Sequence, residues 1–195
     1  MTLPGSSAGS YGAVTAAVRA SEDASTDNSQ GGRSGHNSHV RWHYRDAALL
    51  WLFVPAYVLH MAEEWFGGFP LWIGKIVGHP LQETAYVVIN GIALVLVVLG
   101  IRAAVQSERY GWVGVAIATI ALINTVAHAA GAAVTGSYSP GLISAVVLYV
   151  PLGALTIMRA FDQAPRAQVT RGVVAGIVIH TIVFAVGFAC ARMGG

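Results

Sequence analysis

Histidine and glutamate side chains that could carry chemistry gather around one short stretch of this chain. His60, Glu63 and Glu64 are three and four residues apart, a spacing that places them on one face of a helix. His128 lies far along the sequence in another apolar stretch. Imidazole nitrogens and carboxylate oxygens bind zinc in catalytic sites that keep a fourth position open. The pattern therefore predicts a divalent metal, zinc or iron, held by His60, Glu64 and His128.

Glu63 is predicted to work beside that metal rather than to bind it. A bound metal lowers the pKa of its water toward neutrality, and Glu63, on the other side of His60 from Glu64, would accept the proton as general base. Ionisable and polar groups within apolar segments usually face a bundle interior or a cavity. We therefore expect four further groups around the site: Glu83, Asn90, Asn124 and His180.

The elements that position these residues are predicted to be transmembrane helices. Hydrophobic residues make up 55% of the chain and charged residues only 10%, whereas soluble domains carry roughly 25% charged residues. A helix needs about 20 mainly apolar residues to span a bilayer. Five stretches meet this length: 47–65, 80–104, 110–134, 140–161 and 172–191. Residues 46–195 are thus predicted to form an all-α membrane bundle of about five helices.

Prolines and glycines add detail to this bundle. Pro55 is expected to kink the first helix about one turn earlier. Pro80 and Pro140 are predicted to begin the second and fourth helices, the latter with Ser139 as its cap. The aromatic segment 66–75 is expected to lie at the membrane interface. On the fifth helix, Gly172 and Gly176 share a stripe with His180, and this GxxxG spacing permits close helix approach.

The polar segment 1–45 has few large apolar residues and is predicted to be disordered. Lys and Arg near helix ends favour the cytoplasmic side. Seven lie on the side of the N-terminal tail and two on the opposite side: Arg41, Arg45, Arg102, Arg109, Arg159, Arg166 and Arg171 against Lys75 and Arg192. The N-terminus is therefore predicted inside and the C-terminus outside, in the inner membrane of a bacterium. The metal-binding groups then fall in the outer half of the bilayer.

Some partners and site types are excluded by composition. A single cysteine, Cys190, rules out intramolecular disulfides and argues against thiolate metal clusters. The arginines cluster at segment ends and form no basic stripe, so we expect no nucleic acid partner. The expected partners are the lipid bilayer and a hydrophobic small molecule.

Two motifs resemble those of a known family. The string His60-Met61-Ala62-Glu63-Glu64 and the later Tyr138-Ser139-Pro140-Gly141, with His128 between them, resemble the pattern of the HXXEE family of membrane proteins across roughly residues 46–190. The resemblance implies a membrane protein and no settled activity. The zincin motif H-E-x-x-H is absent, and relative to the inverzincin motif H-x-x-E-H, Glu64 replaces the second histidine.

The favoured hypothesis is a membrane-embedded, metal-dependent, hydrolase-like enzyme that acts on a lipid, an isoprenoid or another hydrophobic molecule. Tyr138 would donate a hydrogen bond to the substrate, although residues 138–141 could equally be a turn that caps the fourth helix. One alternative is an acid-catalysed terpenoid cyclase or isomerase that uses protonated Glu63 or Glu64. Few aromatic residues are expected to line its site, namely Trp65, Tyr86 and Tyr138. The other is a carrier or sensor of metal ions or protons, for which a homodimer would supply the missing repeat.

Overall fold

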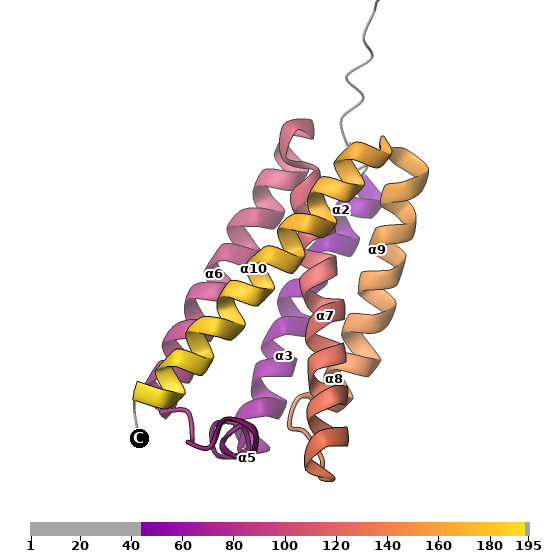
Figure 1. The fold of residues 1–195 in the computed structure, drawn as a ribbon. Coiled ribbons are helices and arrows are strands. Elements are labelled where there is room, and N and C mark those ends of the chain that lie inside the picture. Colours follow the sequence, from indigo (N-terminus) through magenta and orange to yellow (C-terminus); the bar gives the residue numbers. More distant parts are fainter. Residues whose placement is uncertain (1–43, 194–195) are drawn as a thin grey trace, which may run out of the picture. The chain divides into compact units, whose positions relative to one another are not determined.

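The computed structural model describes residues 44–193, so nearly all of the predicted disordered tail, residues 1–45, lies outside the described residues. Every regular element in the described part of the chain is helical (Figure 1). In chain order, the elements are α2 (Tyr44–Trp51), α3 (Phe53–Phe66), α4 (Phe69–Trp72), α5 (Gly74–Val77), α6 (Glu83–Gln106), the 3₁₀ turn η1 (Glu108–Tyr110), α7 (Trp112–Thr135), α8 (Leu142–Ser144), the π-helix η2 (Ala145–Tyr149), α9 (Val150–Gln163) and α10 (Arg166–Met193).

Four of the described helical segments are long and apolar enough to cross a membrane: Glu83–Gln106, Glu108–Thr135, Leu142–Gln163 and Arg166–Met193. Their outward faces carry large apolar side chains, among them Leu96 on α6 and Ile182 on α10. Continuous apolar faces of this kind indicate contact with lipid rather than water. The prediction of an all-α bundle is therefore confirmed for the described residues, with four helical segments that could span a membrane.

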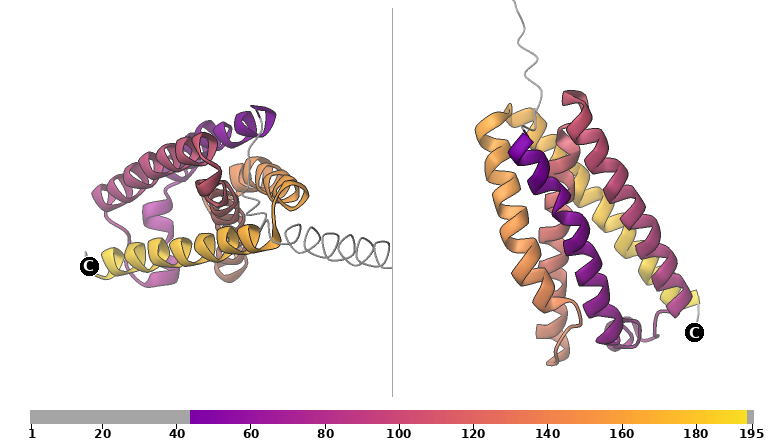
Figure 2. Two further views of the ribbon diagram at one scale, coloured as in Figure 1. Left: turned by 90° about the horizontal axis from the view of Figure 1, so that it is seen from above. Right: turned by 180° about the vertical axis from the view of Figure 1, so that it is seen from behind.

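The first predicted helix is present in two pieces. The break between α2 and α3 lies at Leu52, one turn before Pro55, whose ring nitrogen cannot donate to the carbonyl of Trp51 in the preceding turn. Leu52 itself keeps helical hydrogen bonds to Ala48 and from Ala56, at 3.3 and 3.1 Å. Seen from behind, α2 and α3 nonetheless follow one line beside α9 (Figure 2). Gln163, at the end of α9, donates a hydrogen bond of 3.0 Å to Asp46 of α2. The two segments therefore run antiparallel to each other.

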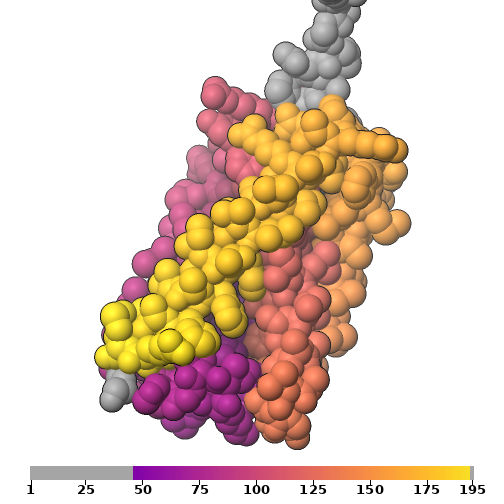
Figure 3. Space-filling model, viewed as in Figure 1, coloured from indigo at the N-terminus to yellow at the C-terminus, as the bar shows by residue number. Residues whose placement is uncertain are grey.

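Helix α7 is the centre of the described bundle and packs against α6, α9 and α10. The GxxxG glycines of α10 make the closest approach. A Cβ atom added to Gly172 would lie 2.5 Å from the Cβ of Val115, and one added to Gly176 would lie 2.7 Å from the carbonyl oxygen of Ala116. The predicted role of this stripe is confirmed, and α10 crosses the front face of the molecule over α7 (Figure 3).

Three predicted helix starts were wrong. The second helix begins at Glu83 rather than Pro80, because Leu81 is buried and donates its backbone N–H to the Pro70 carbonyl at 2.9 Å. The fourth begins at Leu142 rather than Pro140, directly after Gly141 with φ +99°. Ser139 does not cap it. The fifth begins at Arg166, well before Gly172. The segment 66–75 predicted for the interface contains the short helix α4 and the start of α5.

Candidate metal centre

Three buried side chains from α3 and α7 meet at one point. His60 and Glu64 are one turn apart on α3, and His128 approaches from α7. The Nε2 atoms of His60 and His128 lie 3.6 Å and 3.3 Å from Oε1 of Glu64. One ligand atom from each residue lies within 4.8 Å of the other two. The predicted proximity of these three residues is confirmed, and the group could hold a metal ion.

Two serine hydroxyls orient the imidazole rings. Nδ1 of His60 lies 3.0 Å from Oγ of Ser144, and Nδ1 of His128 lies 3.0 Å from Oγ of Ser139. Ser144 Oγ also donates to the Gly141 carbonyl at 3.2 Å, so its oxygen is left to accept the Nδ1–H of His60. That tautomer leaves a lone pair on Nε2, the form of imidazole that binds a metal. Nε2 of His60, which faces Glu64, is thus an acceptor, as a metal ligand must be.

Glu64 and His60 each have one further polar partner. The Tyr86 hydroxyl of α6 donates to Oε2 of Glu64 at 2.9 Å, which leaves Oε1 facing the two imidazoles. The Asn124 amide nitrogen lies 2.8 Å from Nε2 of His60. Asn124 therefore borders the point where the three ligand atoms converge. Asn90 lies farther out, where its amide oxygen accepts a hydrogen bond of 2.9 Å from the Tyr57 hydroxyl.

Glu63 points away from the three ligands and binds the start of the next helical segment. Its carboxylate accepts hydrogen bonds from the backbone N–H groups of Gly141, Ile143 and Ser144, at 3.2, 3.0 and 2.6 Å. It also accepts one from the Tyr138 hydroxyl. A carboxylate with these four donors caps a helix N-terminus from outside. The sequence analysis expected Glu63 beside a metal-bound water. The structure instead places its carboxylate on the backbone before α8.

The loop of Tyr138 to Gly141 closes over the ligands. A Cβ atom added to Gly141 would lie 2.7 Å from Cε1 of His128, 2.8 Å from Cε1 of His60 and 2.9 Å from Cγ of Glu64. Only glycine permits backbone to approach all three side chains this closely, and its φ of +99° also favours glycine. Pro140 packs on Gly67, where an added Cβ would lie 2.7 Å from the Cβ of Pro140. The loop thus connects the end of α3 to the site.

Tyr138 itself lies outside the cavities described below, with its side chain 48% exposed. Partial burial and the hydrogen bond to Glu63 raise the pKa of its hydroxyl to about 12. The hydroxyl is therefore neutral and acts as a donor to Glu63. This contact, rather than a bond to substrate, is the role that the structure gives to Tyr138.

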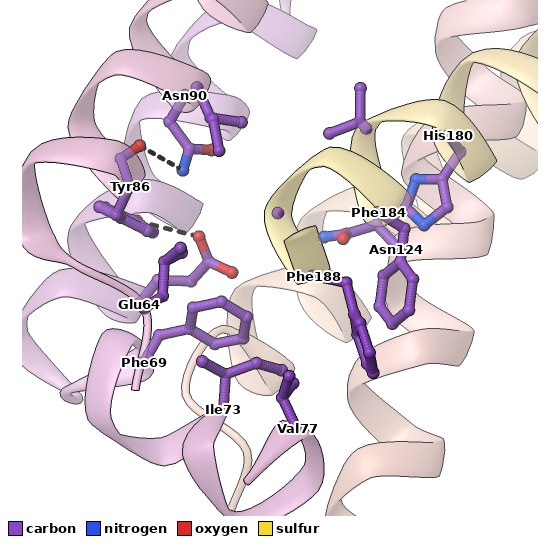
Figure 4. Close-up of a pocket in the computed structure, with 14 residues that line it drawn as sticks. Glu64, Phe69, Ile73, Val77, Tyr86, Asn90, Asn124, His180, Phe184 and Phe188 are labelled. Carbon is purple, nitrogen blue, oxygen red and sulfur yellow. Dashed lines mark hydrogen bonds between the residues drawn. The ribbon is translucent and has the colours of Figure 1, made fainter. Parts of the chain in front are cut away.

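Two cavities meet beside the ligands. One, of about 140 Å³, extends from Glu64 past Phe69 and Ile73 toward α5 (Figure 4). The other, of about 340 Å³, extends along α7 as far as Trp112. Five residues line both cavities: Glu64, Asn90, Asn124, His180 and Val183. Figure 4 shows His180 and Asn124 across the shorter cavity from Glu64.

The predicted surrounding residues are thus brought together with one exception. Asn90, Asn124 and His180 all line the cavities. Glu83 is exposed in the first turn of α6 and lines neither cavity, because its carboxylate favours the helix N-terminus and the surface. His180 is one GxxxG step beyond Gly176, so the close packing of α10 on α7 carries it to the cavities.

Sequence reasoning missed Ser139 in its role toward His128, Ser144 and Tyr149. It named Tyr86 only as an aromatic wall and missed its hydrogen bond to Glu64. Tyr86 is four residues before Asn90 and so shares its helix face, which was a usable signal. Ser144 offered no such signal, because its approach to His60 depends on the contact between Glu63 and the backbone after Gly141.

Comparisons with known proteins give one match. A family model described as a protein of unknown function with HXXEE motif matches residues 51–156, from the end of α2 into α9. This range contains all three ligands and the loop of Tyr138 to Gly141. No curated protein and no solved structure matches the chain.

Proposed function

Because the chain belongs to the HXXEE family, whose model carries no function, we propose a function from the site itself: a membrane-embedded, metal-dependent hydrolase that acts on a hydrophobic substrate. The observation that supports this proposal best is the convergence of His60, Glu64 and His128, all buried. Burying a carboxylate is costly unless a positive charge accompanies it. Among the described residues, the ion-pair partners of Glu64 are His60 and His128, and neither a Lys nor an Arg is among them. A divalent cation would supply the missing charge.

The donor set fits such an ion. Two imidazoles and one carboxylate are a known set for catalytic zinc and for non-haem iron. The serine hydroxyls behind both rings are the outer partners that metal-binding histidines usually have. A bound ion would supply a water that ionises near neutral pH and would polarise a substrate carbonyl.

The chain's own groups have separate roles in this proposal. Asn124 borders the ligand atoms and would orient the water or the substrate oxygen by hydrogen bonding. The cavities would hold the substrate in surroundings that exclude bulk water. We assign Glu63 a positioning role in place of general base, because its carboxylate holds the backbone that carries Ser144 to His60.

The membrane arrangement is part of the same proposal. We propose five spans, with α2 and α3 as a fifth beside the four long segments, the N-terminus in the cytoplasm and the C-terminus outside. This assignment rests on the excess of arginine on one side and on the run of α2 and α3 along α9. We propose the inner membrane of a bacterium as the location of the protein. The site then lies in the outer half of the bilayer.

Metal content of the detergent-purified full chain tests the proposal. We expect about one zinc or iron per chain, and almost none in His60→Ala, Glu64→Gln or His128→Ala, because a site with three ligands loses most of its affinity when one is removed. His79→Ala is the matched control, since His79 is exposed and outside the site. Equal metal in all variants, or no metal in the wild type after incubation with zinc and with ferrous iron, would refute the metal site.

A second candidate function, acid-catalysed cyclisation or isomerisation of a terpenoid, gains support from the cavity walls. Phe69, Tyr86, Phe184 and Phe188 line the shorter cavity, and Tyr149 lines the longer one. Aromatic faces stabilise cations, and the sequence analysis found few such groups. Trp65 and Tyr138, which it named for this role, line neither cavity. Turnover that persists in excess chelator would favour this candidate over the hydrolase.

A further inference from the structure

The polar groups of the cavities lie in the middle and not at an end. Glu64, Asn90, Asn124 and His180 stand where the two cavities meet. From there the short arm runs between apolar side chains of α5 and α10, among them Val77 and Phe188. The long arm runs beside α7 from Asn124 to Trp112, twelve residues or about 18 Å at 1.5 Å per residue. Beyond the junction, most of the residues that line each arm are apolar.

Neither arm offers a site for a charged head group. No Lys, Arg or Asp is among the residues that line the two cavities. Phosphate groups are usually bound by Arg, by Lys or by the N-terminus of a helix. Arg171, whose guanidinium lies 4.5 Å from the centroid of the Trp112 ring at the far end of the long arm, lines neither cavity. The cavities therefore fit an uncharged molecule.

One buried hydroxyl of the long arm has no partner among the described residues. Tyr149 of the π-helix η2 is 3% exposed, and its hydroxyl has no hydrogen bond among the described residues. Tyr149 lines the long arm, and its ring centroid lies 4.8 Å from that of His60. A buried hydroxyl without a partner is costly, and a bound molecule with an oxygen atom near His60 would satisfy it.

We infer that the site binds an uncharged molecule that is apolar on both sides of one central oxygen-bearing group, such as an ester that joins two hydrocarbon chains. This inference rests on the proposed hydrolase function. One chain lies in each arm, and the Tyr149 hydroxyl donates a hydrogen bond to the ester carbonyl. Hydrolysis forms a bond between the acyl carbon and the oxygen of water and breaks the bond from that carbon to the alcohol oxygen. One proton of the water ends on the alcohol, and the acid is the other product.

Two substitutions would shorten the arms separately. Gly187 lines the short arm, and a Cβ atom added there meets nothing within 4 Å, so the side chain of Gly187→Leu starts in open space. Ala93 lines the long arm, which Ala93→Leu would shorten. Gly91→Leu is the matched control, because Gly91 is also in a membrane helix with open space at its Cβ but lines neither cavity.

The experiment measures hydrolysis of three neutral esters by the metal-loaded full chain: cetyl palmitate, ethyl palmitate and cetyl acetate. We expect each cavity variant to lose roughly 10- to 100-fold in kcat/KM for cetyl palmitate. Of Gly187→Leu and Ala93→Leu, one should still cleave ethyl palmitate and the other cetyl acetate, because each variant shortens the arm for only one of the two chains. Tyr149→Phe should lower kcat/KM by roughly 2- to 10-fold, the effect of one neutral hydrogen bond. Gly91→Leu should match the wild type.

The inference is overturned if phosphatidylcholine is cleaved as fast as cetyl palmitate, or if both cavity variants behave like Gly91→Leu. Binding of tritiated dicetyl ether, which has the same chains and no ester, separates this result from failure of the hydrolase proposal. If the metal binds and no ester is cleaved, ether binding that both cavity variants weaken supports the substrate shape while hydrolysis fails. If the ether does not bind the wild type, the inferred substrate is wrong whatever the metal content.

Discussion

The two serines behind the histidines provide a test at the scale of single residues. Ser139 and Ser144 each hydrogen-bond one Nδ1 atom at 3.0 Å. We predict that Ser139→Ala and Ser144→Ala each weaken metal affinity by about 10- to 100-fold, the usual cost of losing an outer partner of a histidine ligand. Ser137→Ala is the control, because its hydroxyl accepts hydrogen bonds from Trp72 and Lys75 and contacts no ligand. Titration with zinc against a competing chelator measures the affinity. Equal affinities in all three variants would remove the serines from the site.

Gly141 provides a second test at this scale. Its φ is +99° and an added Cβ would collide with all three ligands, whereas Gly136 has φ +59° and open space. A left-handed residue other than glycine costs about 1–2 kcal/mol, so both Gly141→Ala and Gly136→Ala should lower the melting temperature of the detergent-solubilised protein. We predict that Gly141→Ala alone also loses the metal.

The measurement is metal stoichiometry beside the thermal melt. Because both variants carry the backbone cost, a difference in metal content reports the collision with the ligands. Retention of full metal content by Gly141→Ala would mean that the loop does not lie on the ligands as described.

The roles of the adjacent glutamates divide differently from the sequence prediction. We predict that Glu64→Gln removes the metal. Glu63→Gln should keep the metal at an affinity about 10- to 100-fold lower, as for other groups outside the ligand set. The amide would place an N–H group against the backbone N–H groups of Gly141 and Ser144, which donate hydrogen bonds to the Glu63 carboxylate. Metal stoichiometry and zinc titration of both variants check this. Loss of metal in Glu63→Gln with full binding in Glu64→Gln would exchange the two roles.

At the scale of single residues, the sequence predicted the three candidate ligands and three polar groups of the cavities, but not the contacts of Glu63 and Tyr138. The i, i+4 spacing of His60 and Glu64 is a local property of a helix, so it could be read directly. The positions of Glu63 and Tyr138 could not, because both depend on the loop before α8 returning to the end of α3. Such a contact joins residues more than seventy positions apart, and no periodicity encodes it.

At the scale of helices, two glycines of α10 differ in how closely other atoms approach them. A Cβ added to Gly176 would lie 2.7 Å from the Ala116 carbonyl oxygen and from the Cβ of Thr119, whereas one added to Gly187 meets nothing. We predict opposite signs for one substitution. Gly187→Ala should leave stability unchanged or raise it by up to about 1 kcal/mol, since alanine favours helices. Gly176→Ala should lower it by about 1–3 kcal/mol through overpacking.

Thermal melts of the two variants in the same detergent check these signs. Equal shifts in melting temperature would show that α10 does not depend on this close approach. Because His180 is four residues beyond Gly176, the same substitution should also displace His180 from the cavity junction.

The presence of each long helix was also easier to predict than the residue at which it begins. Long apolar runs report how much chain lies in lipid, so the segments containing α6, α7, α9 and α10 were all found. The starts at Pro80 and Pro140 were wrong, because proline tolerates a first turn but equally suits a loop. The π-helix Ala145–Tyr149 was not predicted at all. Its extra residue per turn changes which side chains face α3, and the apolar composition of this stretch does not reveal it.

At the scale of the whole molecule, the number of spans depends on α2 and α3. The stretch Tyr44–Phe66, which includes Leu52 between the two helices, contains twenty-three residues. At 1.5 Å per residue it is about 35 Å long, which exceeds the roughly 30 Å core of a bilayer. One end contacts Gln163 through Asp46, and the other contacts Ser144 through Glu63. These contacts mark the two ends of the segment Leu142–Gln163, itself long enough to cross. The α2–α3 segment therefore covers the same depth as an apolar span.

We predict five crossings with the N-terminus in the cytoplasm. Reporter fusions after Gly74 and after the C-terminal residue should report the outside, and fusions after Ser107 and Gln163 the cytoplasm. These four fusions fix the direction of the long spans but give the same result for four or five. A protease-cleavable tag at the N-terminus of the full chain separates the two cases. Protection of this tag in intact cells, together with an external reporter after Gly74, requires α2 and α3 to cross. Cleavage of the tag from outside with the same reporter pattern would leave α2 and α3 on one side of the membrane. It would also remove the basis for placing His60 and Glu64 at the outer end of a span.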